Sequence, residues 1–208
     1  MRWAEPAGPA TLGHMEGRLS LAEWTVLALL REQPAHGFAI AQLTAPGGDL
    51  GRIWRIPRPV VYRSLGRLVE AGLIMPESVE PGQGPQRTIY AVTAQGHREA
   101  ENWLGTPVEH VRDIRSYLLI KLALLYRAGW DPAGLLQRQR AVLDPIAHAI
   151  DAQRAELDGF DAVLLAWRRA SAVAALGFLD DVTPQVADSG RADRPQPHGP
   201  PPATAVST

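Results

Sequence analysis

Cysteine is absent from the 208 residues of the chain. This absence excludes a disulfide framework and a zinc site built on thiolates. The first residues show no positively charged region followed by an apolar core, so we expect no signal peptide. The longest apolar runs fall short of the ~20 residues that cross a bilayer, so we expect no membrane span. These absences predict a soluble cytoplasmic protein.

Residue arrangements that carry out catalysis are also missing. The six histidines show no metal-ligand spacing, and His148 has no second ligand four residues further on. Neither Gly47-Gly48 nor the Gly82/Gly84 pair has the strand-loop-helix context of a phosphate-binding loop. No Ser-His-Asp combination stands out. We therefore predict that the protein is not an enzyme and uses neither a cofactor nor a metal.

A basic stretch, RIWRIPRPVVYRSLGRLVEAGLI at residues 52–74, stands out from a chain with 21 basic and 22 acidic residues. Five arginines, at positions 52, 55, 58, 63 and 67, have no acid among them. Apolar residues recur at helical spacings and predict a buried stripe. The members of that stripe are Val61, Leu65, Leu68 and Val69. A helix with one apolar and one arginine face is typical of DNA recognition, and a solvated arginine face is the alternative.

The elements expected after this helix favour DNA recognition. Two strands, at residues 73–79 and 86–92, are joined by the turn-rich sequence PGQGP and predict a β-hairpin. Pro76 restricts the first strand to a sheet edge, because proline donates no hydrogen bond to a neighbour. Thr93 is then expected to cap a helix over residues 94–104.

Two further helices are expected before the basic one. The first covers residues 19–31, where Ser20 and Glu23 have the spacing of a capping box. The second is short, over residues 38–43, and follows a turn at His36-Gly37. The order of helix, short helix, basic helix, hairpin and helix predicts a winged helix-turn-helix domain.

Together these pieces resemble the PadR family of transcriptional regulators. The resemblance covers about residues 19–180 and rests on LSLAEWTVLALL, PAHGFAIAQL, the basic stretch, RTIYAVTAQGH and VRDIRSYLLIKLALLYRAG. It implies a homodimeric, ligand-responsive regulator with an N-terminal DNA-binding domain and a helical C-terminal domain that forms the dimer. Tyr62-Arg63 matches a family pair that typically meets phosphates, and Arg87 matches the basic position of the wing.

The start of the recognition helix departs from the family's pattern. Where the family usually has small polar residues, this chain has Pro57, Pro59 and Val60. Proline is tolerated in a first helical turn, and a valine there can pack on a thymine methyl group. The full set of expected DNA-contacting residues is Arg55, Arg58, Pro59, Val60, Tyr62, Arg63, Arg67, Gln86 and Arg87.

The C-terminal half is expected to be helical and to form a homodimer. From position 143, apolar residues recur at spacings of three and four, a heptad pattern typical of a seam between helices. The alternative is a helix buried within one subunit, and Asp158-Gly159 marks a point where this helix can divide. The expected dimer interface is Leu143, Ile146, Ile150, Leu157, Phe160, Leu164 and Trp167.

The predicted fold class is mainly α with a small β-hairpin: a winged helix-turn-helix N-terminal domain and an α-helical dimerisation domain. The expected boundaries are a flexible N-terminus (1–17), the winged-helix domain (18–105), the dimerisation and effector domain (106–181) and a disordered tail (182–208). Trp24 and Trp103 are expected either to line a cavity for a small aromatic effector or to be core residues.

The favoured function is a homodimeric DNA-binding repressor of a neighbouring gene, relieved by a small-molecule effector, acting at the nucleoid in the cytoplasm. A two-fold dimer presents two recognition helices and predicts a pseudo-palindromic operator in double-stranded DNA. The alternative is a winged-helix protein that acts as a dimerisation or protein-interaction module without specific DNA binding. Its support is the two prolines and Val60 at the start of the basic helix.

Overall fold

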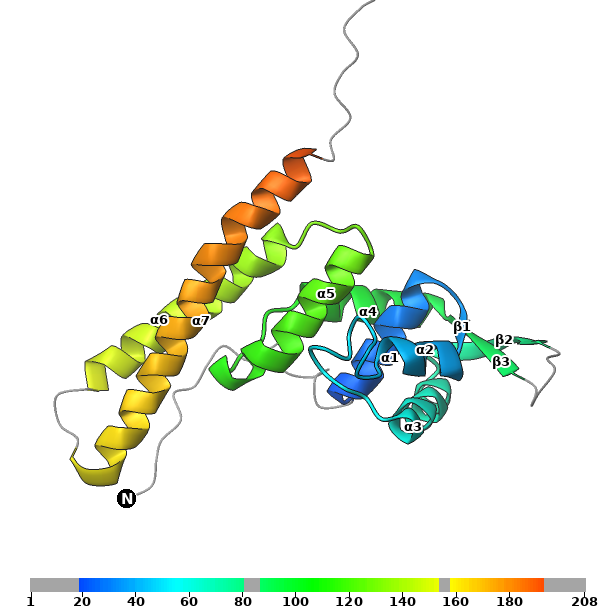
Figure 1. Ribbon diagram of the computed structural model, residues 1–208, viewed down its shortest axis with the longest axis horizontal. Coiled ribbons are helices and arrows are strands. Elements are labelled where there is room, and N and C mark those ends of the chain that lie inside the picture. The colour runs from blue at the N-terminus through cyan, green and yellow to red at the C-terminus, as the bar shows by residue number, and fades with distance from the viewer. Residues whose placement is uncertain (1–18, 81–86, 154–157, 193–208) are drawn as a thin grey trace, which may run out of the picture.

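The computed structural model describes residues 19–80, 87–153 and 158–192, and it is mainly helical with a small sheet, as predicted. A winged-helix region occupies one end, and two long helices form an arm at the other (Figure 1). The region contains helices α1 (Leu21–Glu32), α2 (Gly37–Leu43), α3 (Arg58–Glu70) and α4 (Ala94–Gly105). The arm consists of α6 (Ala133–Ala152) and α7 (Gly159–Ala192), and α5 (Leu119–Arg127) lies between the two ends.

The sheet has three antiparallel strands in the order β1-β3-β2. They are β1 (Ala35–His36), β2 (Ile74–Glu80) and β3 (Arg87–Val92). The sequence predicted the β2–β3 hairpin but not the short β1 strand. Pro76 lies in β2, which pairs only with β3 among the described strands, so the edge position expected for this proline is confirmed.

Side-chain caps fix the starts of two helices as predicted. At α1, Ser20 Oγ accepts from Glu23 N at 3.4 Å, and Glu23 Oε2 accepts from Ser20 N at 2.6 Å. At α4, Thr93 Oγ1 accepts from Gly96 N at 3.1 Å. Each cap satisfies an amide that the first helical turn leaves without a partner.

The basic helix begins where the sequence placed its start, at Pro57, Pro59 and Val60. α3 begins at Arg58, and Arg52 and Arg55 lie in the preceding loop. Pro57, with φ −60° and ψ 141°, is the N-cap. A proline has no N–H to donate, so it fits the start of a helix better than its interior. Val69 is 36 % exposed and is not part of the buried stripe.

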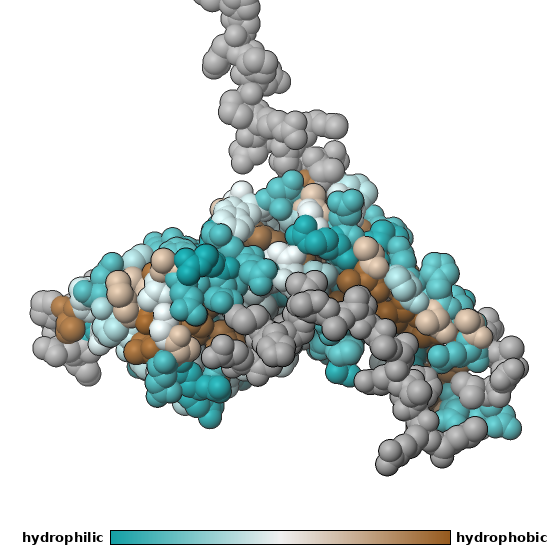
Figure 2. All heavy atoms as spheres, turned by 180° about the vertical axis from the view of Figure 1, so that it is seen from behind, coloured by the Kyte–Doolittle hydropathy of each residue, from teal (hydrophilic) through white to brown (hydrophobic). Residues whose placement is uncertain are grey.

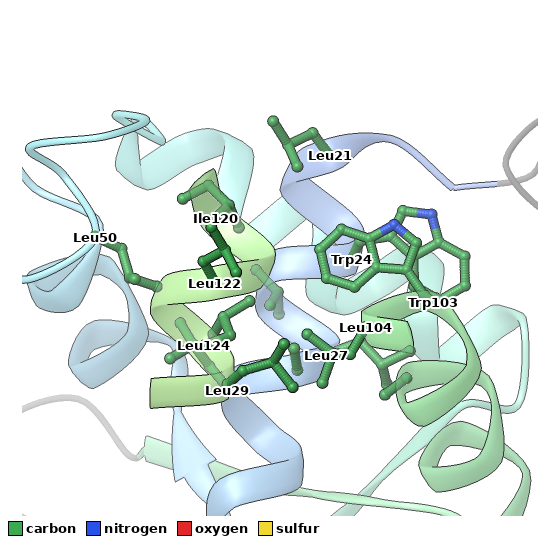
Figure 3. Packing of buried hydrophobic residues seen from close by; sticks show 14 of the residues in the cluster. Leu21, Trp24, Leu27, Leu29, Leu50, Trp103, Leu104, Ile120, Leu122 and Leu124 are labelled. Atoms are coloured by element: carbon green, nitrogen blue, oxygen red, sulfur yellow. The ribbon is translucent and has the colours of Figure 1, made fainter. Parts of the chain in front are cut away.

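A continuous core joins the winged-helix region to α5. Trp24 of α1 and Trp103 of α4 stack with ring centroids 5.4 Å apart and planes only 4° from parallel, as Figure 3 shows. Leucines of α1 and α5 pack beside this pair. Lys121 of α5 is fully buried; its Nζ donates to Thr106 O at 2.7 Å and lies 4.9 Å from the centre of the Trp103 ring.

An ion-paired arginine reinforces this junction from outside. Arg127 of α5 contacts Glu32 of α1 (Nη2–Oε2, 2.9 Å) and Asp49 of the loop after α2 (Nη1–Oδ2, 2.7 Å). The hydrogen bond to Glu32 is the main reason why the pKa of Arg127 is raised above its usual value. The contacts tie α5 to two separate parts of the winged-helix region.

The segment before α5 is not a regular α-helix. A short 3₁₀ turn, η1 (Val111–Asp113), leads into a π-helical turn, η2 (Ile114–Leu118). The sequence predicted a helical C-terminal half but not this turn, because periodicity does not reveal one residue inserted in a helical turn. π-turns inside helices often accompany binding sites, and η1 and η2 border a cavity described below.

The arm agrees with one expectation about the C-terminal half and corrects another. The heptad pattern from position 143 does not belong to one helix, because α6 ends at Ala152 and α7 begins at Gly159, whose positive φ of 56° suits glycine. The division expected at Asp158-Gly159 is therefore present. The tail expected from residue 182 was misplaced, since α7 continues to Ala192 and Val186 is only 3 % exposed.

α7 is also more apolar than the run lengths indicated. Its segment Gly159–Val186, 28 residues long, passes the length and composition test for a membrane span, although only 22 % of the tested window is buried. The uninterrupted apolar runs within this segment are shorter, because isolated polar residues interrupt them. A helix of a soluble protein can pass the same test, so length and composition do not distinguish a membrane span from a helix that packs against protein.

Candidate nucleic-acid interface

The outer face of α3 presents the basic residues that the sequence singled out. Val61, Leu65 and Leu68 are at most 2 % exposed and anchor the inner face of the helix in the core. Arg58 and Arg63 are exposed on the outer side. The apolar stripe therefore sets the direction in which the arginines point, and it leaves them on the surface of the winged-helix region.

The start of α3 and the start of β3 meet around one aromatic ring. The guanidinium carbon of Arg58 lies 5.3 Å from the centre of the Phe38 ring and 5.6 Å from that of Tyr62. The guanidinium carbon of Arg87 lies 5.4 Å from the centre of the Phe38 ring. Both distances to Phe38 are within the range of cation–π attraction.

A cavity of about 300 Å³ opens at this point. The described residues that line it come from β1, α2, α3 and β3, and none of them is an aspartate or glutamate. They are His36, Gly37, Phe38, Arg58, Tyr62, Arg87, Thr88 and Tyr90. Two guanidinium groups and several aromatic and hydroxyl groups thus face one small space, which suits an anion.

Local backbone features hold Phe38 in place. Ala39 N donates to His36 Nδ1 at 3.0 Å, so the imidazole caps α2. Gly37 packs so closely on α3 that an added Cβ would lie 2.9 Å from atoms of Leu65 and Tyr62. The sequence placed Phe38 on a short helix and missed its contacts, although an aromatic residue directly after His36-Gly37 was the available signal.

The other expected DNA-contacting residues have different surroundings. Arg67 Nη1 contacts Glu23 Oε1 at 2.9 Å, so its charge is already paired with a carboxylate whose side chain is only 4 % exposed. Val60 is half-buried against the core, which limits its contact with a base. Arg55 and Pro59 are exposed near the start of α3, and Gln86 lies outside the described residues.

An apolar band on the arm provides a second surface of interest. Seen from behind, brown surface runs along the α6–α7 arm (Figure 2). Three large side chains of α7 are strongly exposed: Phe160 at 76 %, Trp167 at 70 % and Leu164 at 36 %. Their spacing of four and three continues through Ser171, Ala174 and Phe178, so one face of α7 carries the stripe.

This stripe borders a cavity of about 660 Å³ between η1–η2 and the arm. The lining is largely apolar, with arginines of η1, η2 and α7 among it. The lining residues are Val111, Arg112, Ile114, Arg115, Leu119, Ile146, Ile150, Trp167, Arg168, Ser171, Ala174, Ala175 and Phe178. The cavity therefore has room for an apolar group but is open toward the exposed face of α7.

The residues expected at a dimer interface divide into three groups. Phe160, Leu164 and Trp167 lie on the exposed stripe of α7. Ile146 and Ile150 are half-buried and line the cavity beside it. Leu143 is only 1 % exposed inside its own subunit, so it has no surface to offer a partner and its assignment was wrong. Leu157 lies outside the described residues.

The two tryptophans expected near an effector lie in the core instead of on an open cavity wall. Trp24 is 2 % exposed and Trp103 is 3 % exposed, and each covers a face of the other. Their Nε1 atoms are buried with no hydrogen-bond partner. A flat ligand reaches the space between the rings only if the stacked pair separates.

The short α2, the amphipathic α3 and the β2–β3 hairpin define a winged helix-turn-helix protein. Residues 26–102 match the model of the transcriptional regulator PadR-like family. The matched part contains the sheet, α3 and most of α1 and α4.

Comparisons with solved structures and curated proteins give weaker similarities. Bacillus subtilis PadR in complex with operator DNA is 16 % identical, and the match covers 80 % of this chain and 99 % of that one with a TM-score of 0.42. The same protein in complex with p-coumaric acid is 14 % identical, covering 81 % and 99 %, with a TM-score of 0.39. The PadR-like regulator BC1756 from Bacillus cereus is 18 % identical, covering 81 % and 99 %, with a TM-score of 0.35. No curated protein matches the sequence.

Proposed function

We propose that the chain is a DNA-binding transcriptional repressor of a neighbouring gene that works as a homodimer and is released by a small-molecule effector. The observation that carries DNA binding is the arrangement of Arg58, Arg63 and Arg87 on the surface formed by α3 and β3. α3 presents Arg58 and Arg63 on a helix whose other face is fixed in the core, and β3 places Arg87 beside them. A helix of this kind fits the major groove, and the hairpin beside it contacts the flanking backbone.

The dimer is supported by the exposed stripe of α7. Phe160 and Trp167 leave large apolar surfaces in water, and the residues beside them repeat at heptad spacing. A second copy of α7 covers such a stripe with the same residues from the other side, as two-fold symmetry requires. A dimer also presents two α3 helices to DNA, so the operator is a pseudo-palindrome.

Release by an effector is supported by the cavity between η1–η2 and the arm. Its size of about 660 Å³ and its apolar walls suit a small, largely apolar molecule, including an aromatic one. The segment that borders it continues into α5, which is bonded to α1 and to the loop before α3 through Arg127. A ligand that shifts this segment acts on the spacing of the two recognition helices. We propose that the protein does so in the cytoplasm, bound to the nucleoid.

The experiment that tests this function is selection of genomic DNA. Purified full-length protein is incubated with fragmented DNA from its source at near-physiological salt, and the retained fragments are sequenced. We expect a few enriched sites that share an inverted repeat and that disappear with the Arg58→Ala/Arg63→Ala variant. Arg98→Ala, which removes an exposed arginine from α4, is the control and should retain them.

Two other outcomes contradict the proposal. Uniform, salt-sensitive recovery of all fragments means that the arginines bind phosphates without reading bases. No recovery by a folded dimer supports the alternative of a protein-interaction module. For the specific complex, about four neutralised phosphates per subunit predict a slope of log K against log salt of about −7, from roughly −0.9 for each phosphate.

A further inference from the structure

The cavity beside Phe38 has features that base recognition by α3 does not explain. Arg58 comes from a helix and Arg87 from a strand far away in the sequence, yet both guanidinium groups lie over the same ring. Two like charges repel each other, so this arrangement is costly unless something compensates for it. Among the described residues that line the cavity, none carries a carboxylate that would do so.

Phe38 reduces the cost of holding these side chains. A free arginine has many rotamers, and fixing them on binding costs conformational entropy. The Phe38 ring attracts both guanidinium groups through its face and so limits their motion before any ligand arrives. The ring is itself restrained, because Gly37 packs against α3 and the His36 ring lies 6.2 Å from that of Phe38.

We propose that this cavity is a seat for one backbone phosphate of DNA and that Phe38 is the positioning residue that aligns Arg58 and Arg87 around it. A phosphodiester has one negative charge and two non-bridging oxygens, so it can accept from both guanidinium groups at once. The Tyr62 and Thr88 hydroxyl groups line the same space and add possible donors. Reading a guanine would instead use one arginine in a bidentate contact.

The seat rests on the proposed DNA binding and adds a role for a residue that does not itself carry charge. It links the first turn of α3 to the base of the wing through a single phosphate. The two elements would then be fixed relative to the DNA backbone at one point, which sets how deeply the rest of α3 enters the groove.

The test compares Phe38→Leu and Phe38→Tyr with the unchanged full-length protein. The probes are a labelled duplex of mixed sequence and a duplex carrying an inverted repeat enriched in the genomic selection. We expect Phe38→Leu to weaken binding to both probes by about three- to tenfold, because two ring–guanidinium contacts are lost. Phe38→Tyr keeps the ring and should bind like the unchanged protein.

Trp130→Leu is a matched control, because it removes a ring that lies 3.7 Å from the guanidinium of Arg31, away from α3. It should leave DNA affinity unchanged. A double-mutant cycle then shows that Phe38 acts through the arginines. In an Arg58→Ala/Arg87→Ala background, Phe38→Leu should weaken binding no further. Thermal melting identifies any variant whose lost binding follows from lost folding, and Phe38→Tyr remains informative in that case.

A methylphosphonate scan of the enriched duplex locates the phosphate itself. Neutralising one particular phosphate should weaken binding of the unchanged protein but not of the Arg58→Ala/Arg87→Ala variant. The seat is overturned if folded Phe38→Leu binds both probes normally, or if its loss depends on base sequence. If the unchanged protein binds neither probe, it is the proposed function that fails. If the unchanged protein binds specifically and Phe38→Leu binds just as well, the phosphate seat is rejected and the proposed function stands.

Discussion

Two tryptophan-bearing regions of this chain, the Trp24–Trp103 pair and the stripe of α7 with Trp167, have opposite environments. In the winged-helix region, Trp24 and Trp103 are 2 % and 3 % exposed and stack within a core that α5 completes. On the arm, Trp167 is 70 % exposed and Phe160 is 76 % exposed. The Trp24–Trp103 pair is covered by residues of its own subunit. The stripe of α7 leaves comparable side chains in water, which is the condition of a surface that acts with a partner.

The largest effect should come from opening the closed core. Trp103→Ala removes a stacked, buried indole and should lower the free energy of unfolding by about 3–5 kcal/mol. Urea denaturation followed by circular dichroism measures the change. Trp130→Ala is the control, because Trp130 is 37 % exposed and its loss should cost much less. Equal destabilisation by the two changes would contradict the core position of Trp103.

A charge on the open surface should break assembly and leave folding intact. Trp167→Glu places a carboxylate in the stripe of α7 and should cost the dimer at least about 2 kcal/mol of association free energy. Sedimentation equilibrium measures it as a shift toward monomer. Ala166→Glu, an equally charged change at an exposed position on another face of α7, should keep the dimer. A dimer that tolerates Trp167→Glu places the interface elsewhere.

Two arginines of α3 should separate stability from DNA binding. Arg67→Ala leaves the buried carboxylate of Glu23 without its charged partner, so it should lower the free energy of unfolding by about 1–2 kcal/mol. Arg63→Ala should leave stability unchanged and weaken DNA binding. Parallel measurements of melting and DNA affinity check the pair. If Arg67→Ala instead left stability unchanged and weakened DNA binding, Arg67 would leave Glu23 and bind a phosphate in the complex.

The smallest effect should arise where the two regions join. Arg127→Ala removes the contacts to Glu32 and Asp49, which are partly exposed, and should cost about 0.5–1 kcal/mol. Differential scanning calorimetry measures the loss, which should decrease at high salt because screening already weakens the pairs. A loss that is insensitive to salt would show that the aliphatic part of Arg127 provides the contribution.

The sequence was sufficient for the winged-helix fold because its signals are local. Ser20 with Glu23, Thr93 at a helix start and Pro76 at a sheet edge each act through neighbouring backbone, and all three are confirmed. The hairpin and the buried stripe of α3 are likewise set by period and turn residues. The start of α3 at Arg58 also agrees with the sequence, because Pro57 and Pro59 mark a place where a helix can begin.

Contacts between segments that are distant in the sequence could not be predicted from it. Nothing near Arg67 indicates that Glu23 pairs with it, and nothing near Phe38 indicates two guanidinium groups above its ring. The heptad pattern gave the spacing of the apolar residues but not their partner, so it did not separate buried Leu143 from exposed Trp167. Whether an apolar residue is buried within the subunit or exposed to a partner depends on the tertiary structure, which the spacing does not give.

The length of α7 has a mechanical consequence. At 34 residues, and with a rise of ~1.5 Å for each, the helix is a rod about 50 Å long. A tilt of about 5° at one end displaces the other by about 4 Å, close to the ~3.4 Å rise between neighbouring bases of a strand. A small change in angle where two such rods cross would therefore be amplified into a mismatch of one base-pair step at the operator.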